Sequence, residues 1–288
     1  GNCQNCSMNG TCGNAGAPHI MQEQLQCIDQ SMEEVKHKIL ILSGKGGVGK
    51  STITYLLSKS FAKLFEVGIL DLDLCGPSLP FLFNHPCEDV LDTSFGFQPC
   101  FITHNISLIS LQYFLDNPDD PVIARGPMKN SLILKLIKDV DWSEVNTLLI
   151  DTPPGTSDEH LSVTSFLSQT GIDGAVIVTT SEEIALSDIR REIRFCQKAN
   201  LKILGIIENM SSYQCPLCHK DSKIYPETSG GVKALCESEN IQFLGSIPID
   251  PSIVAGCIGE KYPISERLAQ ISDKIRDEII ASYQSPSK

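Results

Sequence analysis

A glycine-rich segment that begins at Gly44 carries the strongest chemical signal in the chain. The sequence GKGGVGKST follows the apolar run KILILS and has the G-x-x-x-x-G-K-[ST] spacing of a phosphate-binding loop. Glycines let successive backbone N–H groups converge on phosphate oxygens, and the following helix directs the positive end of its dipole at them. Lys50 is then expected to neutralise the β- and γ-phosphates, and the Ser51 hydroxyl to bind Mg²⁺. We predict an ATP site that comprises Gly44, Lys45, Gly46, Gly47, Val48, Gly49, Lys50, Ser51 and Thr52.

Three aspartates at the ends of apolar runs supply the acids that phosphoryl chemistry needs. Asp151 ends the run TLLID and is followed by TPPG, the place for an acid that holds the Mg²⁺ shell. Asp71 and Asp73 lie in LDLDLCGPS, and alternate positions of an extended segment share one face. One of these two can orient the attacking water while the other supports the metal, or either can cap the following turn. We assign the water to Asp73.

A pair of cysteines forms a second candidate site. Cys215 and Cys218 form CPLC in a polar segment after the run KILGIIEN, with His219 next. Two thiolates at this spacing bind one face of a metal, but a closed tetrahedral site needs four ligands. The same segment of a second protomer across a twofold axis would supply the other two. An iron–sulfur cluster, zinc and a redox-active pair are all open from the residues alone.

Three further cysteines lie close together at the N-terminus. Cys3, Cys6 and Cys12 have the spacing C-x₂-C-x₅-C, which is similar to the spacing of cluster ligands. The fourth ligand is open: Cys27, an external group, or a segment upstream of this chain can supply it, or three thiolates can hold a labile cluster. An inert flexible tail is the remaining alternative. The other cysteines, namely Cys75, Cys87, Cys100, Cys196, Cys236 and Cys257, show no ligand spacing and are expected to pack as small apolar residues.

The elements that must position these residues alternate between strand and helix. Short apolar runs without polar alternation predict strands covered on both faces, at 38–43, 67–71, 106–111, 147–151, 174–179, 202–209 and 243–249. Helices are expected at 50–65, 128–140, after 157, at 185–199, after 230 and at 264–279. The predicted fold is a doubly wound α/β domain with a mostly parallel sheet over residues 38–288, preceded by a cysteine-containing extension over residues 1–37.

Composition limits the classes of function. The chain has 288 residues, 41% of them hydrophobic, and a formal net charge of −12, so we expect no affinity for nucleic acid or anionic lipid. No apolar run approaches the ~18 residues of a membrane span, and no secretory signal is visible. Twelve cysteines in a chain that we expect to be cytoplasmic favour metal ligands over disulfides.

Four motifs together resemble one family. Lys45 in GKGGVGKST, together with DLDLCGPS, DTPPGTSDEH and ENMS, is similar to the deviant Walker A ATPases of the Mrp and MinD type. Over nearly the whole chain the nearest likeness is to the N-terminally extended eukaryotic cytosolic iron–sulfur cluster assembly scaffold ATPases. The resemblance implies a dimer that sandwiches ATP, with Lys45 reaching a phosphate on the opposite protomer. It also implies that Asn209 contacts adenine, with Pro248 and Asp250 nearby.

The same resemblance implies a function. A [4Fe–4S] cluster would bridge two protomers at Cys215 and Cys218, and a second cluster would lie at the N-terminal cysteines, which in the relatives follow a fourth cysteine upstream. The expected activity is Mg²⁺-dependent ATP hydrolysis that serves cluster assembly and transfer. The implied partners are a second copy or a shorter paralogous scaffold ATPase, together with apoprotein recipients and targeting factors.

Three other functions compete with this interpretation. An ATP-dependent electron-transfer protein would hold its bridging cluster firmly. A regulatory P-loop NTPase would hold zinc. A positioning ATPase of the MinD or ParA type is disfavoured, because it needs a basic surface or basic tail and neither the net charge nor the C-terminal helix provides one.

Overall fold

The structure is a computed structural model of the chain. It describes residues 32, 34–73, 78–85, 90–94, 96–114, 126–155, 163–164, 166–167, 171–215, 217–226, 230–253 and 264–284. Cys3, Cys6 and Cys12 lie outside these residues, as does most of the predicted extension.

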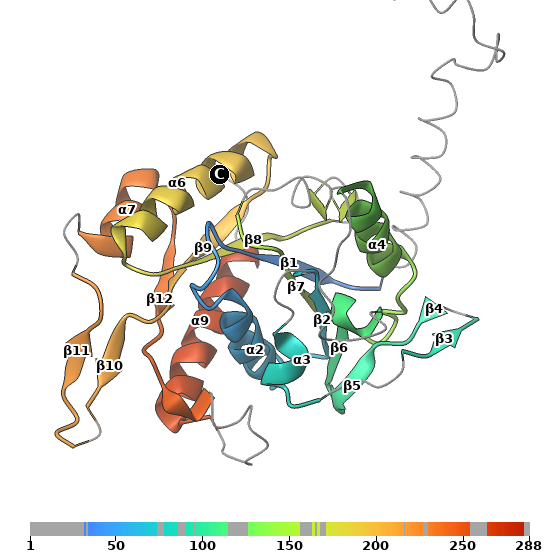
Figure 1. Cartoon of the computed structure of the whole chain (residues 1–288), viewed down its shortest axis with the longest axis horizontal. Coiled ribbons are helices and arrows are strands. Elements are labelled where there is room, and N and C mark those ends of the chain that lie inside the picture. The colour runs from blue at the N-terminus through green and yellow to red at the C-terminus, as the bar shows by residue number, and fades with distance from the viewer. Residues whose placement is uncertain are drawn as a thin grey trace, which may run out of the picture.

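One sheet of eight strands organises the domain (Figure 1). In their order across the sheet the strands are β12 (Phe243–Ser246), β9 (Ile203–Glu208), β8 (Gly174–Thr179), β1 (His37–Leu42), β7 (Thr147–Asp151), β2 (Val67–Asp71), β6 (Ile106–Ser110) and β5 (Cys100–Thr103). All neighbouring strands are parallel except the edge pair formed by β5 and β6. The predicted mostly parallel, doubly wound fold is therefore confirmed.

The central strands are apolar through their middle residues because helices cover both faces of the sheet. Side chains alternate between the faces, so each strand contributes to two separate cores. In β1, for example, Ile39 and Ile41 belong to one core, whereas Leu40 and Leu42 belong to the other. All four are at most 1% exposed.

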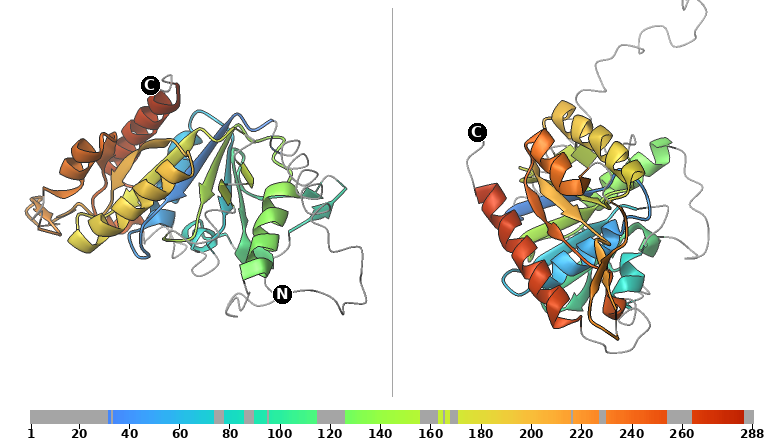
Figure 2. Two further views of the ribbon diagram at one scale, coloured as in Figure 1. Left: turned by 90° about the horizontal axis from the view of Figure 1, so that it is seen from above. Right: turned by 90° about the vertical axis from the view of Figure 1, so that its left-hand side faces the viewer.

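The helices divide between the two faces in the way that the two cores require. On one face lie α2 (Lys50–Phe61) and α9 (Glu266–Gln284), and on the other lie α4 (Gly126–Lys138), α6 (Glu183–Lys198) and α7 (Gly231–Glu239), as Figures 1 and 2 show. Two short helical segments, α3 (Leu79–Leu82) and the 3₁₀ turn η1 (Leu111–Phe114), follow β2 and β6. None of the helices that the structure describes is both long and apolar enough to span a membrane.

Three of the expected strands have the observed bounds, and the longer runs 202–209 and 243–249 form the shorter strands β9 and β12. The runs 67–71, 147–151 and 174–179 are β2, β7 and β8 with the predicted bounds. Helix α2 ends at Phe61, earlier than expected, because residues 62–64 form a turn. Of the helix expected after residue 157, only four residues are described, and all four are helical.

Three small β elements were not predicted. The edge strand β5 runs antiparallel to β6, and β3 (Asp92–Thr93) pairs with β4 (Gly96–Phe97). Two polar strands, β10 (Ser212–Gln214) and β11 (Asp221–Lys223), form an antiparallel hairpin, which we call the cysteine hairpin. Of the segment CPLC, the described residues Cys215, Leu217 and Cys218 lie in the turn of this hairpin.

Candidate nucleotide and cysteine sites

The strand order brings the predicted nucleotide-binding residues together. Strands β8, β1, β7 and β2 are successive neighbours, and being parallel they end at the same edge of the sheet. The glycine-rich loop follows β1, Asp151 ends β7 and Asp71 ends β2. In open parallel sheets this carboxyl edge is where ligands bind.

The glycine-rich loop surrounds a hollow of about 340 Å³. Gly49, the residue immediately before α2, lies in the left-handed region with φ of 82°, and no side chain caps the helix start. The first N–H groups of a helix lack partners within that helix, so they are free to bind an anion. The hollow is lined by Ser43, Lys45, Gly46, Gly47, Val48, Gly49, Lys50, Ser51, Thr52, Asp73, Ser78 and Pro154.

Asn209 supports the loop from behind. Its side-chain amide donates a hydrogen bond to the carbonyl of Val48 at 2.8 Å, and its backbone N–H donates to Thr179 at 2.7 Å. A Cβ at Gly49 would approach the Asn209 amide nitrogen to 2.2 Å, so this glycine allows the contact as well as the turn. Asn209 is buried and is not among the residues that line the hollow, so its described role is to hold the loop.

The first turns of α2 hold the Asp151 carboxylate. Ser51 donates to one oxygen of Asp151 at 2.7 Å, and Thr54 donates to the other at 2.8 Å. The ammonium of Lys50 lies 2.7 Å from Asp151 and 3.9 Å from Asp73. Asp151 is fully buried and the Lys50 side chain is only 5% exposed, so this ion pair is formed largely away from water.

Asp71 lies opposite Asp151 in the parallel register of β2 and β7. Its carboxylate accepts hydrogen bonds from the Ser110 hydroxyl at 3.0 Å and the Asp73 backbone N–H at 3.1 Å. Burial, followed by the nearby negative charge of Asp151, raises the pKa of Asp71 to about 8, although Lys50 and these hydrogen bonds act in the opposite direction.

This donor set fits Mg²⁺ and a nucleotide phosphate. Three carboxylates, those of Asp71, Asp73 and Asp151, surround the single ammonium of Lys50, so the cluster has an excess of negative charge when all of them are ionised. Carboxylate and hydroxyl oxygens are the ligands that Mg²⁺ prefers, and the metal usually completes its shell with phosphate oxygens. Ser51 and Asp151 would hold the ion beside the hollow, where it would neutralise phosphate charge.

Lys45, the extra lysine of the loop, is engaged within its own chain. Its ammonium lies 2.5 Å from a carboxylate oxygen of Glu182, which immediately precedes α6. Both side chains are about one-third exposed. The start of α6 also packs on the loop, because a Cβ at Gly44 would lie 2.8 Å from the backbone of Asp188. Lys45 must leave Glu182 to reach a phosphate on another protomer.

The cysteine hairpin presents its two thiols at an exposed turn. The Cys215 N–H donates to Lys220 at 3.0 Å, and the His219 N–H donates back to the Cys215 carbonyl at 2.9 Å. His219 itself adopts a positive φ of 55°, which closes the turn. Cys215 is half-buried, Cys218 is exposed, and Leu217 between them is 92% exposed. Both sulfur atoms are free thiols.

The turn also makes one of these thiols more acidic. Hydrogen bonds from the backbone N–H groups of Cys218 and Leu217 to the Cys215 sulfur lower the pKa of Cys215 below its ordinary value. The thiolate is the form that binds metals. In the described part of the chain, no third histidine, cysteine or acidic side chain joins Cys215 and Cys218 to form a metal-binding group.

Most of the predicted site residues that are described come together in one of two places. Gly44 to Thr52, Asp71, Asp73 and Asp151 gather at the sheet edge, and Cys215 and Cys218 lie on the hairpin. Thr54, Ser110 and Glu182 were missed. Thr54 could have been found, because it lies three residues after Ser51 and so shares its helix face.

Cys196 and Cys236 are buried as expected, but Cys100 is disulfide-bonded, so the expected role as a free packing thiol is wrong for that residue.

Comparisons with known proteins agree with this architecture. Residues 34–282 match the model of a ParA family described as NUBPL iron-transfer P-loop NTPase. The cytosolic Fe-S cluster assembly factor NBP35 of Kluyveromyces lactis is 46% identical over 287 residues, which cover 96% of this chain and 87% of that protein.

Solved structures show the same fold. A nucleotide-binding protein from Archaeoglobus fulgidus, in complex with ADP, is 32% identical with a TM-score of 0.67, over 88% of this chain and 92% of that one. The cell division ATPase MinD of Pyrococcus furiosus is 25% identical with a TM-score of 0.58, over 86% of this chain and 99% of that one. The chain therefore belongs to the ParA/NUBPL family of iron-transfer P-loop NTPases.

Proposed function

We propose that this chain is a cytosolic, Mg²⁺-dependent ATPase that assembles iron–sulfur clusters on its surface and passes them to apoproteins. The observation that carries the proposal is that one short segment of the chain connects the nucleotide site to the cysteine pair. Asn209 holds the glycine-rich loop at Val48, and the thiol pair begins only six residues later, at Cys215. The relative from Kluyveromyces lactis bears the name of a cytosolic Fe-S cluster assembly factor.

The nucleotide site would act by placing positive charge beside the phosphates of ATP. Lys50 would turn from Asp151 to the β- and γ-phosphates, and Ser51 with Asp151 would hold Mg²⁺. Asp73 lines the hollow beside Lys50, so it would orient the attacking water. Asp71 keeps its proton at neutral pH, because its pKa lies near 8, and in that state it adds no further negative charge beside Asp151.

Dimerisation would complete the nucleotide site. In a sandwich of two copies, Lys45 would leave Glu182 and stabilise the phosphate charge of the opposite copy, as an arginine finger does. We further propose that Asn209 contacts adenine in that state, with Pro248 and Asp250 close by. Because the Asn209 amide also bonds the carbonyl of Val48, this residue would then connect the glycine-rich loop to the bound base.

The same dimer would complete the cysteine site. Cys215 and Cys218 of two copies would supply four thiolates, the number that a [4Fe–4S] cluster takes. The lowered pKa of Cys215 favours this ligation near neutral pH. Cys3, Cys6 and Cys12 would contribute to a second cluster. The second protomer would be another copy or a shorter paralogous scaffold ATPase, and recipients and targeting factors would bind the loaded dimer.

Anaerobic reconstitution tests this function. The chain is incubated with ferrous salt, sulfide and zinc, and iron, sulfide and zinc are quantified for the wild type and for variants that lack either cysteine group. For the wild type we expect iron and sulfide in equal amounts. In the double variant Cys215→Ala with Cys218→Ala we expect both to be lost from the hairpin site. Zinc alone would support a regulatory NTPase, and a cluster that survives redox cycling without transfer would support electron transfer. Nucleotide-dependent binding to DNA or lipid vesicles would support a positioning ATPase.

A further inference from the structure

Helix α9 contacts both the helix of the nucleotide site and the cysteine hairpin. Its apolar side chains Leu268, Ile275 and Ile279 are at most 1% exposed in the core beneath α2. Its N-terminal turn contacts the hairpin through Arg267. Figure 1 shows α9 between α2 and the hairpin strands β10 and β11. One helix is thus the structural neighbour of both sites.

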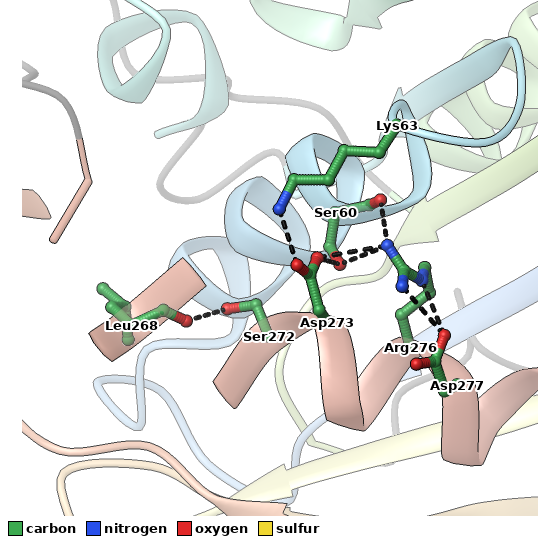
Figure 3. Close-up of polar contacts among 7 residues, drawn as sticks. All are labelled: Ser60, Lys63, Leu268, Ser272, Asp273, Arg276 and Asp277. Atoms are coloured by element: carbon green, nitrogen blue, oxygen red, sulfur yellow. Dashed lines mark hydrogen bonds and ion pairs between the residues drawn. The ribbon is translucent and has the colours of Figure 1, made fainter. Parts of the chain in front are cut away.

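The attachment to α2 is a compact polar network (Figure 3). Asp273 accepts hydrogen bonds from the Ser60 hydroxyl at 2.6 Å and from the Lys63 ammonium at 2.7 Å. Arg276 donates to the backbone carbonyl of Ser60 at 2.8 Å and to Asp273 at 3.1 Å. The Arg276 side chain is only 10% exposed, so these partners compensate a charge that is largely removed from water. The network fixes α9 to the last turn of α2.

The attachment of α9 to the hairpin is a bidentate ion pair between Arg267 and Asp221. Arg267 donates from its two terminal nitrogens to the two oxygens of Asp221, at 3.1 and 3.0 Å. Asp221 begins β11 and pairs across the hairpin with Gln214, the residue immediately before Cys215. The guanidinium therefore holds the hairpin at the position where it enters the cysteine turn.

The two attachments lie on opposite sides of α9. Arg267 and Arg276 are nine residues apart, which corresponds to two and a half turns and about 13.5 Å along the helix axis. The start of the helix is itself capped, because Ser265 accepts a hydrogen bond from the Leu268 N–H at 3.3 Å. A capped helix that is fixed to α2 can hold a second element at a constant distance.

The other strand of the hairpin is held by a different contact. The Ile249 N–H donates to the Ser212 carbonyl at 2.8 Å, at the base of β10. The preceding residue, Ser211, donates from its backbone N–H and its hydroxyl to the Ile247 carbonyl at 3.1 and 3.2 Å, so β10 is anchored at its base. A hairpin anchored at the base of one strand can still bend at its far end, whereas a contact on the second strand near the turn limits that movement. The Arg267 contact is therefore placed where it limits the direction of the two thiols.

We propose that Arg267 is a positioning residue for Cys215 and Cys218, and that α9 is the brace that holds the cysteine hairpin in place relative to the P-loop helix. The side chains of Arg267 and Asp221 are 43% and 47% exposed, so the pair contributes little to overall stability. Its bidentate geometry nevertheless fixes orientation. The consequence for a shared cluster rests on the proposed function, whereas the positioning of the hairpin does not.

Amide hydrogen exchange of the full-length chain without metal tests the positioning directly. In Arg267→Ala and in Asp221→Ala we expect the protected amides of Cys215 and His219 to exchange about two- to fivefold faster, the range for an exposed ion pair. The melting temperature and the basal ATPase activity should stay at wild-type values. The matched control is Arg194→Ala, which removes an exposed arginine paired with Glu239 on the opposite face of the sheet and should not change hairpin exchange.

A charge exchange separates the ion pair from simple loss of a side chain. Arg267→Asp and Asp221→Arg each place like charges opposite one another, and the double variant restores an attractive pair. We expect both single variants to speed hairpin exchange and the double variant to return it toward the wild-type rate. Unchanged exchange in the single variants, or no recovery in the double variant, would overturn the proposal.

Iron extraction then links positioning to the cluster. In reconstituted protein we expect a chelator to remove iron two- to fivefold faster from Arg267→Ala than from the wild type. If the wild type holds no iron but exchange still rises in the variant, the positioning role stands and the proposed function fails. If the wild type holds iron and the variant changes neither exchange nor extraction, the positioning role fails alone.

Discussion

The nucleotide site and the cysteine hairpin are built in opposite ways. At the nucleotide site a buried aspartate, Asp151, has both oxygens bonded by α2, and the adjoining Lys50 is only 5% exposed. On the hairpin, two strands of three residues each present free thiols beside a leucine that is 92% exposed. The first site is organised within one chain before any ligand binds. The second has half the ligands that a closed metal site needs, so it depends on a second contributor.

This difference indicates where each site is sensitive. Changing a buried charge leaves its partners without compensation and costs much, whereas changing an exposed side chain costs little unless it touches the ligand. Substitutions in the nucleotide site should therefore affect both folding and chemistry. Substitutions of the two hairpin thiols should affect metal binding and leave folding unchanged.

The largest expected effect is the loss of catalysis in Lys50→Ala. Removing the ammonium takes away a charge that would face the phosphates and leaves Asp151 and Asp73 unneutralised. We expect the ATPase rate to fall by about 10²–10³-fold or more, measured as phosphate release in saturating Mg-ATP. Lys59→Ala, on the exposed side of α2, is the control and should keep the wild-type rate. A Lys50→Ala rate within tenfold of wild type would show that the buried charges do not form the catalytic site.

The next effect separates the two regions. Cys215→Ser with Cys218→Ser should abolish iron binding at the hairpin, because serine does not replace thiolate ligands. The melting temperature should change little, since surface substitutions away from packed features are usually within about 0.5 kcal/mol. Cys196→Ser is the converse control: this cysteine is fully buried on α6, so its substitution should lower the melting temperature and leave hairpin iron unchanged. Loss of stability in the hairpin variant would contradict the comparison.

A moderate effect concerns a buried acid away from both sites. Glu192 on α6 is fully buried, neither of its oxygens has a hydrogen-bond partner in the described part of the chain, and burial raises its pKa to about 8. Between its ordinary pKa of 4.5 and about 8 the folded state binds more protons than the unfolded state, so stability falls as pH rises. The raised pKa of Asp71 likewise makes the stability of the folded state fall as pH rises.

Glu192→Gln should therefore flatten the pH dependence of stability. We expect the variant to melt with the wild type near pH 5 and roughly 2–4 °C above it near pH 8, the shift that 1 kcal/mol gives in a domain of this size. Thermal melts at the two pH values measure this. Equal melting temperatures at both would show that Glu192 is ionised and stabilised in the folded state.

The smallest effect concerns the contact that holds Lys45. Glu182→Gln weakens a pair whose side chains are about one-third exposed, so the change in free energy stays below about 1 kcal/mol. Freed from this contact, Lys45 should support ATP-dependent dimerisation about two- to fivefold better. Sedimentation with a non-hydrolysable ATP analogue measures it, and Lys45→Ala is the control that should lose dimerisation. Weaker dimerisation in Glu182→Gln would assign the carboxylate a supporting role instead.

The sequence predicts these two regions unequally, for physical reasons. Strands such as β7 and β8 are recognisable because burial on both faces requires unbroken apolar runs. The strands of the cysteine hairpin are polar and three residues long, so neither alternation nor hydrophobicity marks them. The pairing of Lys45 with Glu182 depends on which loops adjoin at the sheet edge, which follows from strand order rather than from spacing.

The raised pKa of Asp71 also follows from the fold, first through burial of the carboxyl group and then through the nearby charge of Asp151. Asp71 and Asp151 are 80 residues apart in the sequence, and only the register of β2 on β7 places them opposite each other. Motifs therefore identify the acids, but the raised pKa of Asp71 depends on the topology.

Native mass spectrometry of the reconstituted protein tests the central claim most directly, namely that two chains must come together to complete the cysteine site. The measurement uses a variant in which Cys3, Cys6 and Cys12 are alanine, so that the hairpin thiols are the ligands under test. We predict a dimer that carries about four iron and four sulfide ions, and that becomes iron-free when Cys215 and Cys218 are also replaced. Iron held by a monomer, or by a dimer that keeps it after that replacement, would contradict the account.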